Sequence, residues 1–277
     1  MAMFQIVSAG LSDIGRKRQS NQDRFLLDDH HRLYLVADGM GGHQAGEVAS
    51  QLVVDSIHKF YMSNTTPSTS VPGQTHDPSL SSEANRLREA IGYANLQVYQ
   101  ASVAHKHYQG MGSTLAAVQF SNNMLIAANV GDSPIFLVHD DAIEMLSVPH
   151  TLMAEQSELS SGDQTAFGPE LRHVLTRGMG VEDTVSPDIW ESPCFSGDCL
   201  VICSDGLSGT VAPEEIKDLV ATPNPAAACQ SLVDLANQRG GDDNITVVVL
   251  QVHKPDTLLQ RLRDGMARFA GGGLSGK

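Results

Sequence analysis

The fold is decided by residues 113–139, which read STLAAVQFSNNMLIAANVGDSPIFLVH. Two apolar, strand-like runs at 113–120 and 124–130 are separated by Ser121-Asn122-Asn123, a tight turn by its length and residue types. A second turn, Gly131-Asp132-Ser133, leads into a third run at 134–139. Strands that follow one another without an intervening helix predict antiparallel pairing. They exclude a simple parallel, doubly wound sheet.

The rest of the chain adds strands and amphipathic helices to this core. We expect further strands at the apolar runs 4–9, 32–37, 199–204 and 244–252. Residues 44–61 and 83–104 carry apolar side chains at helical spacing, and Pro213 and Pro225 stand at the first turn of two shorter helices. Antiparallel strands combined with long amphipathic helices fit a layered sandwich of the α+β class.

The length of 277 residues fits one large domain better than two. Residues 62–82 are rich in Ser, Thr and Pro and predict a flexible loop between two helices. Residues 149–172 have weak periodicity and predict a mobile flap. Pro255 opens a last apolar-striped helix, which either packs on the domain or binds a partner, with packing favoured. Gly271-Gly272-Gly273 ends it, so we expect residues 254–277 to form a C-terminal helix and a flexible tail.

Charge and cysteine usage limit the class of protein. The net charge is −14, which disfavours nucleic acid and anionic membranes as partners. The four cysteines form no Cys-x-x-Cys pair, and buried reduced thiols are the expected reading. No apolar run reaches transmembrane length and no signal peptide is visible. We therefore expect a soluble, cytoplasmic protein that does not bind a membrane.

Aspartates occupy comparable positions next to several strands. The first lies in Asp38-Gly39-Met40-Gly41-Gly42-His43, directly after the apolar run 33–37. Asp132 and Asp205 also follow predicted strands, and Asp243 precedes one. In antiparallel sheets the end of one strand lies beside the beginning of its neighbour. These four carboxylates are therefore expected to gather at one rim of the sandwich.

Such a gathering requires compensation by positive charge. At ~5 Å and an effective dielectric of about 20, each pair of carboxylates repels by roughly 3 kcal/mol. Several pairs would consume most of the stability of a domain, ~5–15 kcal/mol. Either the acids are not clustered and are ordinary turn residues, or divalent cations hold them together. All-oxygen ligation favours Mg²⁺ or Mn²⁺ over Zn²⁺.

The motifs around these aspartates resemble the metal-dependent serine/threonine protein phosphatases of the 2C type, in their bacterial form. The resemblance spans about residues 5 to 253 and rests on an ordered set: Arg18-Gln19-Ser20-Asn21-Gln22-Asp23, the 38–43 stretch, Gly112-Ser113-Thr114, Asn129-Val130-Gly131-Asp132-Ser133, Leu175-Thr176-Arg177-Gly178-Met179-Gly180, Ser204-Asp205-Gly206-Leu207 and Gly241-Asp242-Asp243-Asn244. It implies a four-layer α/β/β/α sandwich of two antiparallel sheets flanked by helices, with residues 1–253 as the catalytic domain.

The resemblance also implies a metal centre of Mn²⁺ or Mg²⁺, with two core ions and a third, weaker one. Asp38 matches the carboxylate that bridges the two core metals, and Gly39 matches the residue whose carbonyl ligates the second metal. Asp205 and Asp243 match the remaining ligands of the first metal. Asp132, together with Asp205, matches the ligands of the third.

Other residues match supporting roles. Asp23 is expected to hold metal-bound waters. Gln22 is expected to contact a water of the second metal, although many members of the family have Glu there, so metal affinity is expected to differ.

Two prolines also depart from the family pattern. Pro134 replaces an arginine, from which we infer only a local structural change. Pro149 replaces an aspartate near the flap, which bears on flap contacts and substrate preference.

The implied chemistry is hydrolysis of phosphoserine and phosphothreonine by a hydroxide that bridges the two metals. Arg18 is expected to bind the phosphoryl oxygens with its planar fork. His43 matches the general acid that protonates the leaving oxygen. Two alternatives for His43 are a zinc site shared with Glu47 and a helix-start residue without a chemical role.

The sequence therefore predicts a protein-serine/threonine phosphatase. Its expected substrates are phosphorylated proteins, the targets of a serine/threonine kinase, and it is expected to be a monomer. One alternative is a catalytically silent member of the same fold that acts as a scaffold or binding module; such a protein would be expected to lack some of the metal aspartates, and none is missing. A second alternative is a phosphatase for small phosphate esters.

Overall fold

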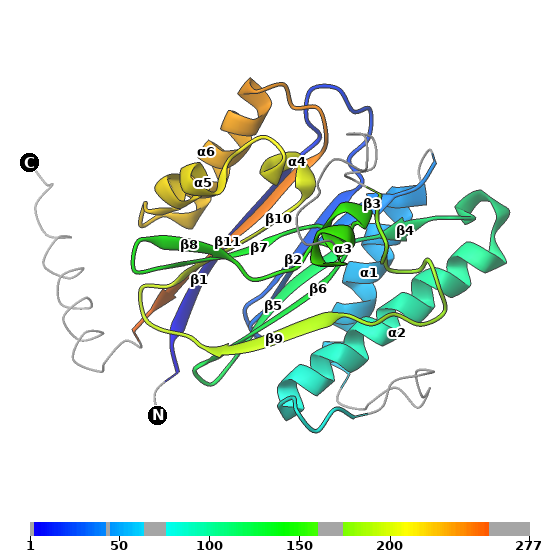
Figure 1. The fold of residues 1–277 in the computed structure, drawn as a ribbon, viewed down its shortest axis with the longest axis horizontal. Coiled ribbons are helices and arrows are strands. Elements are labelled where there is room, and N and C mark those ends of the chain that lie inside the picture. Colours follow the sequence, from blue (N-terminus) through cyan, green and yellow to red (C-terminus); the bar gives the residue numbers. More distant parts are fainter. Residues whose placement is uncertain (1–2, 43–44, 64–75, 160–173, 255–277) are drawn as a thin grey trace, which may run out of the picture.

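The central hairpin forms as the sequence predicts. This computed structural model describes residues 3–42, 45–63, 76–159 and 174–254 (Figure 1). Strands β5 (Leu115–Ser121) and β6 (Met124–Val130) pair antiparallel from Leu115↔Val130 to Ser121↔Met124. Asn122 adopts a positive φ of 53° in the turn, a conformation that asparagine tolerates well.

Two antiparallel sheets form the centre of the molecule. The first contains, in spatial order, β1 (Gln5–Asp13), β11 (Ile245–His253), β10 (Cys199–Cys203), β7 (Ile135–His139) and β8 (Ala142–Met145). The second contains β2 (Asp23–Asp28), β3 (Leu33–Met40), β5, β6 and β9 (Asp188–Pro193), with the short β4 (Gly112–Ser113) beside β3. All the strand pairs within these described sheets are antiparallel, which confirms the expected class.

Helices cover the outer face of each sheet (Figure 1). Helices α1 (Ala45–Met62) and α2 (Ser82–Ala104) lie on the β2–β9 sheet, and the short η1 (Lys106–Tyr108) follows α2. Helices α5 (Pro213–Val220) and α6 (Pro225–Gln238) cover the other sheet, after the single turn of α4 (Asp205–Ser208). Both proline-opened helices begin where the sequence predicts, and Ser81 and Asn224 cap α2 and α6 with their side-chain oxygens.

Three apolar layers fill the spaces between these four layers of structure. One lies under α1 and α2 and contains Leu35 and Ile57. Another lies under α5 and α6 and contains Val201 and Leu232. The third lies between the sheets and contains Val36. Because β3 is covered on both faces, its sequence is a continuous apolar run and not an alternating one. The four-layer sandwich is confirmed.

Some elements were not predicted from the sequence. Strand β2 follows a polar loop, β8 is short and mostly exposed, and β9 is an edge strand with no fully buried residue. Helix α3 (Leu152–Leu159) lies within the predicted flap, and its weak periodicity gave no helical signal. The remainder of the flap from residue 160 to 172, most of the 62–82 loop and the C-terminal segment from residue 255 lie outside the described residues.

The four cysteines are free and buried, as expected. Cys199 and Cys203 point to the same apolar layer, under α5 and α6. Among the described helices, none is both long and apolar enough to cross a membrane.

Candidate metal centre

The predicted acids meet in one cavity of about 450 Å³. Its walls come from segments that are far apart in the chain. Asp38 comes from β3, Asp132 from the β6–β7 turn, Asp205 from the start of α4 and Asp243 from the loop before β11. The same cavity is lined by Arg18, Gln22 and Gly39. The predicted gathering of carboxylates at one rim is therefore present.

Asp38 lies inside a strand and not at its exit, since β3 continues to Met40. Two hydrogen bonds with Thr114, the residue directly after β4, hold the backbone of Asp38. The Asp38 N–H donates to Thr114 Oγ1 at 3.0 Å, and its carbonyl accepts from the Thr114 N–H at 2.8 Å. Burial, followed by the charges of Asp23, Asp205, Asp243 and Asp132, raises the pKa of Asp38 well above its ordinary value. Thr114 belongs to the Gly-Ser-Thr motif, but sequence reasoning gave it no role.

Glycine at position 39 is required by close packing. A Cβ there would collide with the backbone carbonyl of Gly46 in α1. The Gly39 N–H donates to the Gln22 carbonyl at 3.1 Å, which joins the end of β3 to the loop before β2. Gly39 therefore allows strand, loop and helix to meet at the rim of the cavity.

Arg18 supplies positive charge to this acidic cavity. Its Nη2 donates to Asp243 Oδ2 at 2.6 Å, and its side chain remains about half exposed. The bond to Asp243 is the main cause that raises the pKa of Arg18, with smaller contributions from the charges of Asp38 and Asp205. A half-exposed guanidinium at the mouth of a cavity is well suited to meet an incoming anion.

Asp23 lies behind the cavity and is almost fully buried, with 1% of its surface exposed. Its Oδ2 accepts from Ser204 Oγ at 2.7 Å, and Ser204 Oγ in turn accepts from the Thr246 N–H at 3.0 Å. The other oxygen, Oδ1, is buried without a hydrogen-bond partner among the described residues. Burial raises the pKa of Asp23 to about 6. A buried carboxylate oxygen of this kind requires a nearby cation or an ordered water.

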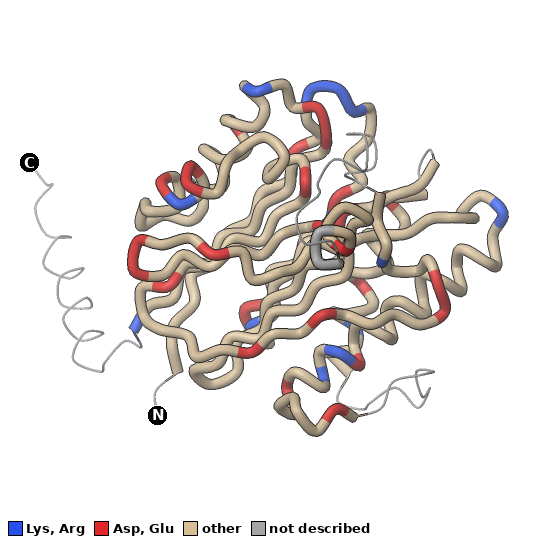
Figure 2. The backbone as a smooth tube through the Cα atoms, viewed as in Figure 1, with Lys and Arg blue, Asp and Glu red and all other residues tan. Residues whose placement is uncertain are grey.

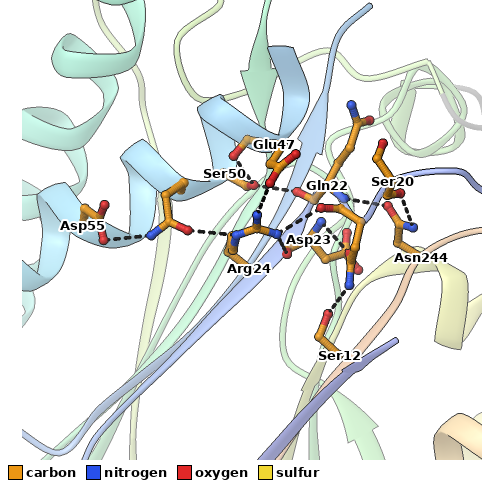
Figure 3. A network of polar contacts seen from close by, with 11 residues as sticks. Ser12, Ser20, Gln22, Asp23, Arg24, Glu47, Ser50, Asp55 and Asn244 are labelled. Carbon is orange, nitrogen blue, oxygen red and sulfur yellow. Dashed lines mark hydrogen bonds and ion pairs between the residues drawn. The ribbon is translucent and has the colours of Figure 1, made fainter. Parts of the chain in front are cut away.

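Asn244 joins the N-terminal loop to β11, as Figure 3 shows. Its Nδ2 donates to the carbonyls of Ile14 and Ser20 at 2.9 and 3.0 Å, and its Oδ1 accepts from the Gln22 N–H at 2.8 Å. These bonds fix the loop that carries Arg18. The residue stands in a quoted motif, yet its role was not found from the sequence.

A second part of this network connects β2 with α1 (Figure 3). Arg24 donates to Glu47 Oε1 at 2.7 Å and to the Asp23 carbonyl at 2.7 Å. Glu47 is therefore held by an arginine, which does not support the zinc alternative. His43, its suggested partner and the predicted general acid, lies outside the described residues.

The donor set fits divalent ions that prefer oxygen. In the described part of the chain, no three His, Cys, Asp or Glu side chains converge closely enough to hold one ion by themselves. This does not match a closed zinc cage of protein ligands. This arrangement of oxygen donors fits Mg²⁺ or a similar ion, because such an ion keeps several of its waters and binds only one or two carboxylates directly. Bound divalent cations would compensate the repulsion among the crowded carboxylates. They would also provide a partner, directly or through a water, for the buried Asp23 oxygen.

The base of the flap is fixed beside Asp132. Leu152 N–H donates to the Val174 carbonyl at 3.0 Å, and Thr176 N–H donates to the His150 carbonyl at 2.9 Å, so the two ends of the segment are joined. The buried His150 accepts from the Gly131 N–H at Nδ1 (3.1 Å) and therefore donates from Nε2 to Asp188 (3.1 Å). Burial lowers the pKa of His150, which agrees with this neutral form.

The two unusual prolines lie on the other side of Asp132. Pro134 and Pro149 line a neighbouring cavity of about 390 Å³, together with Asp132 and Phe136. The carbonyl of Pro134 accepts from the Cys203 N–H at 3.2 Å and so extends the pairing of β7 with β10. Because this bond uses the backbone carbonyl, it does not depend on proline at position 134, and the local structural change inferred there stays a prediction.

Comparison with known proteins gives one consistent family. The family model described as Protein phosphatase 2C matches residues 10–246. Serine/threonine phosphatase stp of Listeria welshimeri is 32% identical over 260 residues, which cover 91% of this chain and 97% of that protein. Protein phosphatase PhpP of Streptococcus pneumoniae is 30% identical over 257 residues, which cover 89% and 97%. The crystal structure of the catalytic domain of serine threonine protein phosphatase PstP, in complex with 2 manganese ions, has a TM-score of 0.74 at 30% identity and covers 90% of this chain and 99% of that chain. This chain therefore belongs to the protein phosphatase 2C family and is a protein phosphatase.

Proposed function

We propose that the acidic cavity is the catalytic centre of this phosphatase. The protein is a metal-dependent protein-serine/threonine phosphatase, and its substrates are phosphoproteins. The observation that carries the assignment is the meeting of Asp38, Asp132, Asp205 and Asp243 from distant segments in one cavity. Such a cluster is costly without cations, so the acids are best explained by a function that uses them.

The residues suited to hold the ions follow from the lining of this cavity. We assign Asp38, Asp205, Asp243 and the Gly39 carbonyl to two core ions, and Asp132 with Asp205 to a third. Mn²⁺ or Mg²⁺ fits the oxygen donors, and the related PstP structure contains two manganese ions. When bound, such ions supply an activated water as the nucleophile and positive charge for the phosphoryl oxygens.

Side chains of the protein bind the substrate, position the Arg18 loop and transfer the proton. Arg18 binds phosphoryl oxygens, which compete with Asp243 for the same N–H donors. Asn244 keeps the Arg18 loop in position through its bonds to Ile14 and Ser20. We assign the transfer of a proton to the leaving serine or threonine oxygen to His43, because an imidazole with a pKa near 6.5 suits that step. Asp23 and Gln22 orient waters beside the cavity.

The finer parts of the proposal concern organisation and biological context. We assign the catalytic domain to residues 1–253. The natural substrates are inferred to be the targets of a serine/threonine kinase of the same cell, and the protein is inferred to act as a monomer. The cytoplasmic location and the absence of membrane binding stay predictions.

A peptide assay tests the catalytic centre directly. The purified protein should release phosphate from a phosphothreonine peptide in the presence of Mn²⁺ and should lose this activity in chelator. Asp38→Asn should reduce turnover by at least about 100-fold. Asp234→Asn changes a surface aspartate on α6 that accepts from Gln230 and should remain fully active. Full activity in chelator, or an active Asp38→Asn protein, would overturn the assignment.

A further inference from the structure

A second cavity of about 430 Å³ adjoins the catalytic one. The two share lining residues Thr176, Arg177, Gly178 and Val181. The other lining residues of the second cavity are Arg88 of α2 and Glu182, Thr184, Val185, Ser186 and Pro187. The two cavities are therefore direct neighbours, and we call the second one the flanking pocket.

Two arginines line the flanking pocket of this acidic protein. Arg88 and Arg177 line it, and among its described lining residues Glu182 is the sole acid. The whole chain carries a net charge of −14, and acidic positions are spread over both halves of the fold (Figure 2). Each arginine is paired with an aspartate beside the pocket, Asp188 or Asp77, so an anionic ligand would compete with these carboxylates for the guanidinium groups.

The two arginines are held differently. Arg177 Nη1 donates to Asp188 Oδ1 at 2.7 Å and to the Ser186 carbonyl at 3.3 Å, so its guanidinium is fixed in the wall. Arg88 is joined to Asp77 by a longer contact of 3.7 Å between Nη1 and Oδ2. An ion pair of that length contributes little to stability, so the Asp77 carboxylate competes only weakly for the Arg88 Nη1 donor.

Hydroxyl groups in the same lining add hydrogen-bond capacity. Thr184 and Ser186 belong to the wall. Thr176, at the boundary of the two cavities, has its Oγ1 buried without a hydrogen-bond partner among the described residues. A buried hydroxyl without a partner is costly, and rotation of the Thr176 side chain toward the pocket would let a ligand oxygen bind it.

The pocket is built on a fixed framework. The fully buried Asn95 of α2 accepts from the Gly180 N–H at 2.7 Å and donates to the Glu182 carbonyl at 3.0 Å. These bonds attach the wall segment to the same helix that carries Arg88. The backbone of this wall is therefore fixed before a ligand binds, which reduces the entropic cost of binding.

We propose that the flanking pocket binds an anionic group of the substrate, either an Asp or Glu carboxylate or a second phosphate, close in sequence to the phosphorylated residue. This inference rests on the proposed catalytic centre. If each cavity is treated as a sphere of its own volume and the two spheres touch, the centres of the cavities lie roughly 9–10 Å apart. An extended peptide advances ~3.3 Å per residue, so the anionic group lies about three residues from the phosphorylated one. Arg88 is the residue that selects for it.

Matched peptides test this selection. One series carries a phosphothreonine with a single Asp moved from four residues before it to four residues after it, in an otherwise neutral sequence. A second series carries a non-hydrolysable phosphonate analogue of phosphoserine at the same positions. In the wild type, an anion about three residues away on one side should raise kcat/KM about five-fold over the Ala peptide, mainly through KM. A gain restricted to the phosphonate series identifies a second phosphate as the ligand.

Substitutions in α2 distinguish the contribution of the flanking pocket from that of the catalytic centre. Arg88→Gln should abolish the gain and leave kcat/KM for the Ala peptide and for para-nitrophenyl phosphate unchanged. Arg88→Lys should retain part of the gain. Arg86→Gln is the matched control, because the Arg86 guanidinium lies over the Tyr61 ring at 4.8 Å and does not line the pocket.

The outcomes distinguish the two proposals. A wild type that hydrolyses all peptides equally, or an Arg88→Gln protein that keeps the preference, overturns the flanking pocket but leaves the catalytic centre intact. Failure to hydrolyse even para-nitrophenyl phosphate with Mn²⁺ refutes the catalytic assignment and this inference with it. The preference of the wild type should also decline with added salt, which checks its electrostatic origin independently of any variant.

Discussion

Asp38→Asn should stabilise the metal-free protein while it removes activity. The substitution keeps the shape of the side chain and removes one negative charge from the cavity. Both hydrogen bonds to Thr114 use the backbone of Asp38 and are therefore retained. The substitution isolates the electrostatic cost of the cluster, because the pKa of Asp38 is raised by burial and by its acidic neighbours.

The magnitude follows from the size of the cavity. A volume of about 450 Å³ corresponds to a sphere roughly 10 Å across, so charges on opposite walls lie about 10 Å apart or slightly more. At an effective dielectric of about 20, each pair interacts by ~2 kcal/mol. Asp38 faces three other carboxylates and the guanidinium of Arg18 across this space, which leaves two uncompensated repulsions. With screening by water and salt in an open cavity, the net gain in free energy of unfolding is about 2 kcal/mol.

Thermal unfolding in chelator measures this gain. At low salt and pH 7.5, Asp38→Asn should raise Tm by roughly 4–8 °C, and the difference should shrink in 1 M salt. Saturating Mn²⁺ should stabilise the wild type by about 3 kcal/mol at 100 times Kd and should reverse the order of the two proteins. Asp234→Asn on α6 should show neither effect. A metal-free Asp38→Asn protein that melts at or below the wild-type temperature would refute the electrostatic reasoning.

The other predictions concern the support of the site. Arg18→Ala should lower kcat/KM for a phosphopeptide about 100-fold, and calorimetry should show Mn²⁺ binding that is retained or tighter, since a competing cation is gone. Asn244→Ala removes three hydrogen bonds and should cost about 3 kcal/mol in urea unfolding. Burial raises the pKa of Asp23 from 3.8 to about 6, so the folded metal-free protein holds the proton longer than the unfolded chain. The contribution of Asp23 to the free energy of unfolding in chelator should therefore fall by up to about 3 kcal/mol as pH rises from about 4 through 6, which the difference between wild type and Asp23→Asn in urea titrations at pH 4 and 7 would measure. The Cys203 thiol, whose pKa burial raises, should react with a thiol reagent only after unfolding.

The sandwich was predictable because its central strands are covered on both faces. Burial on two sides leaves continuous apolar runs such as 33–37 and 124–130, and these stand out in the sequence. The strands that were missed are those with weak burial. Strand β9 pairs along one edge with β6 and has no fully buried residue, so its sequence carries almost no pattern. Pairing with a well-defined neighbour gives it a strand conformation that its own residues do not predict.

The acidic lining of the site was predictable for a different reason. Carboxylates next to apolar strands are unusual, and the order of the motifs identified them as a set. Residues that support them are neutral and common, so Thr114, Ser204 and Asn244 carried no comparable signal. These three residues act through contacts between segments more than 40 residues apart. Such contacts become visible only in the folded structure. The flanking pocket likewise arises from α2 and residues 176–187, which no local pattern joins.

The division between charged lining and neutral support has a physical consequence. The bond that Thr114 Oγ1 accepts from the Asp38 N–H and the bond that Asn244 donates to the Ile14 carbonyl keep their strength whether or not ions are present, because neither partner changes its charge. The carboxylates, in contrast, favour the folded state only when cations compensate them. A framework that depended on the carboxylates would loosen whenever metal dissociated. Since the framework here is neutral, the cavity should keep its shape without metal, and rebinding should not require refolding. Substitution of Asn244 should therefore weaken metal binding and stability together, whereas substitution of Asp38 should separate them.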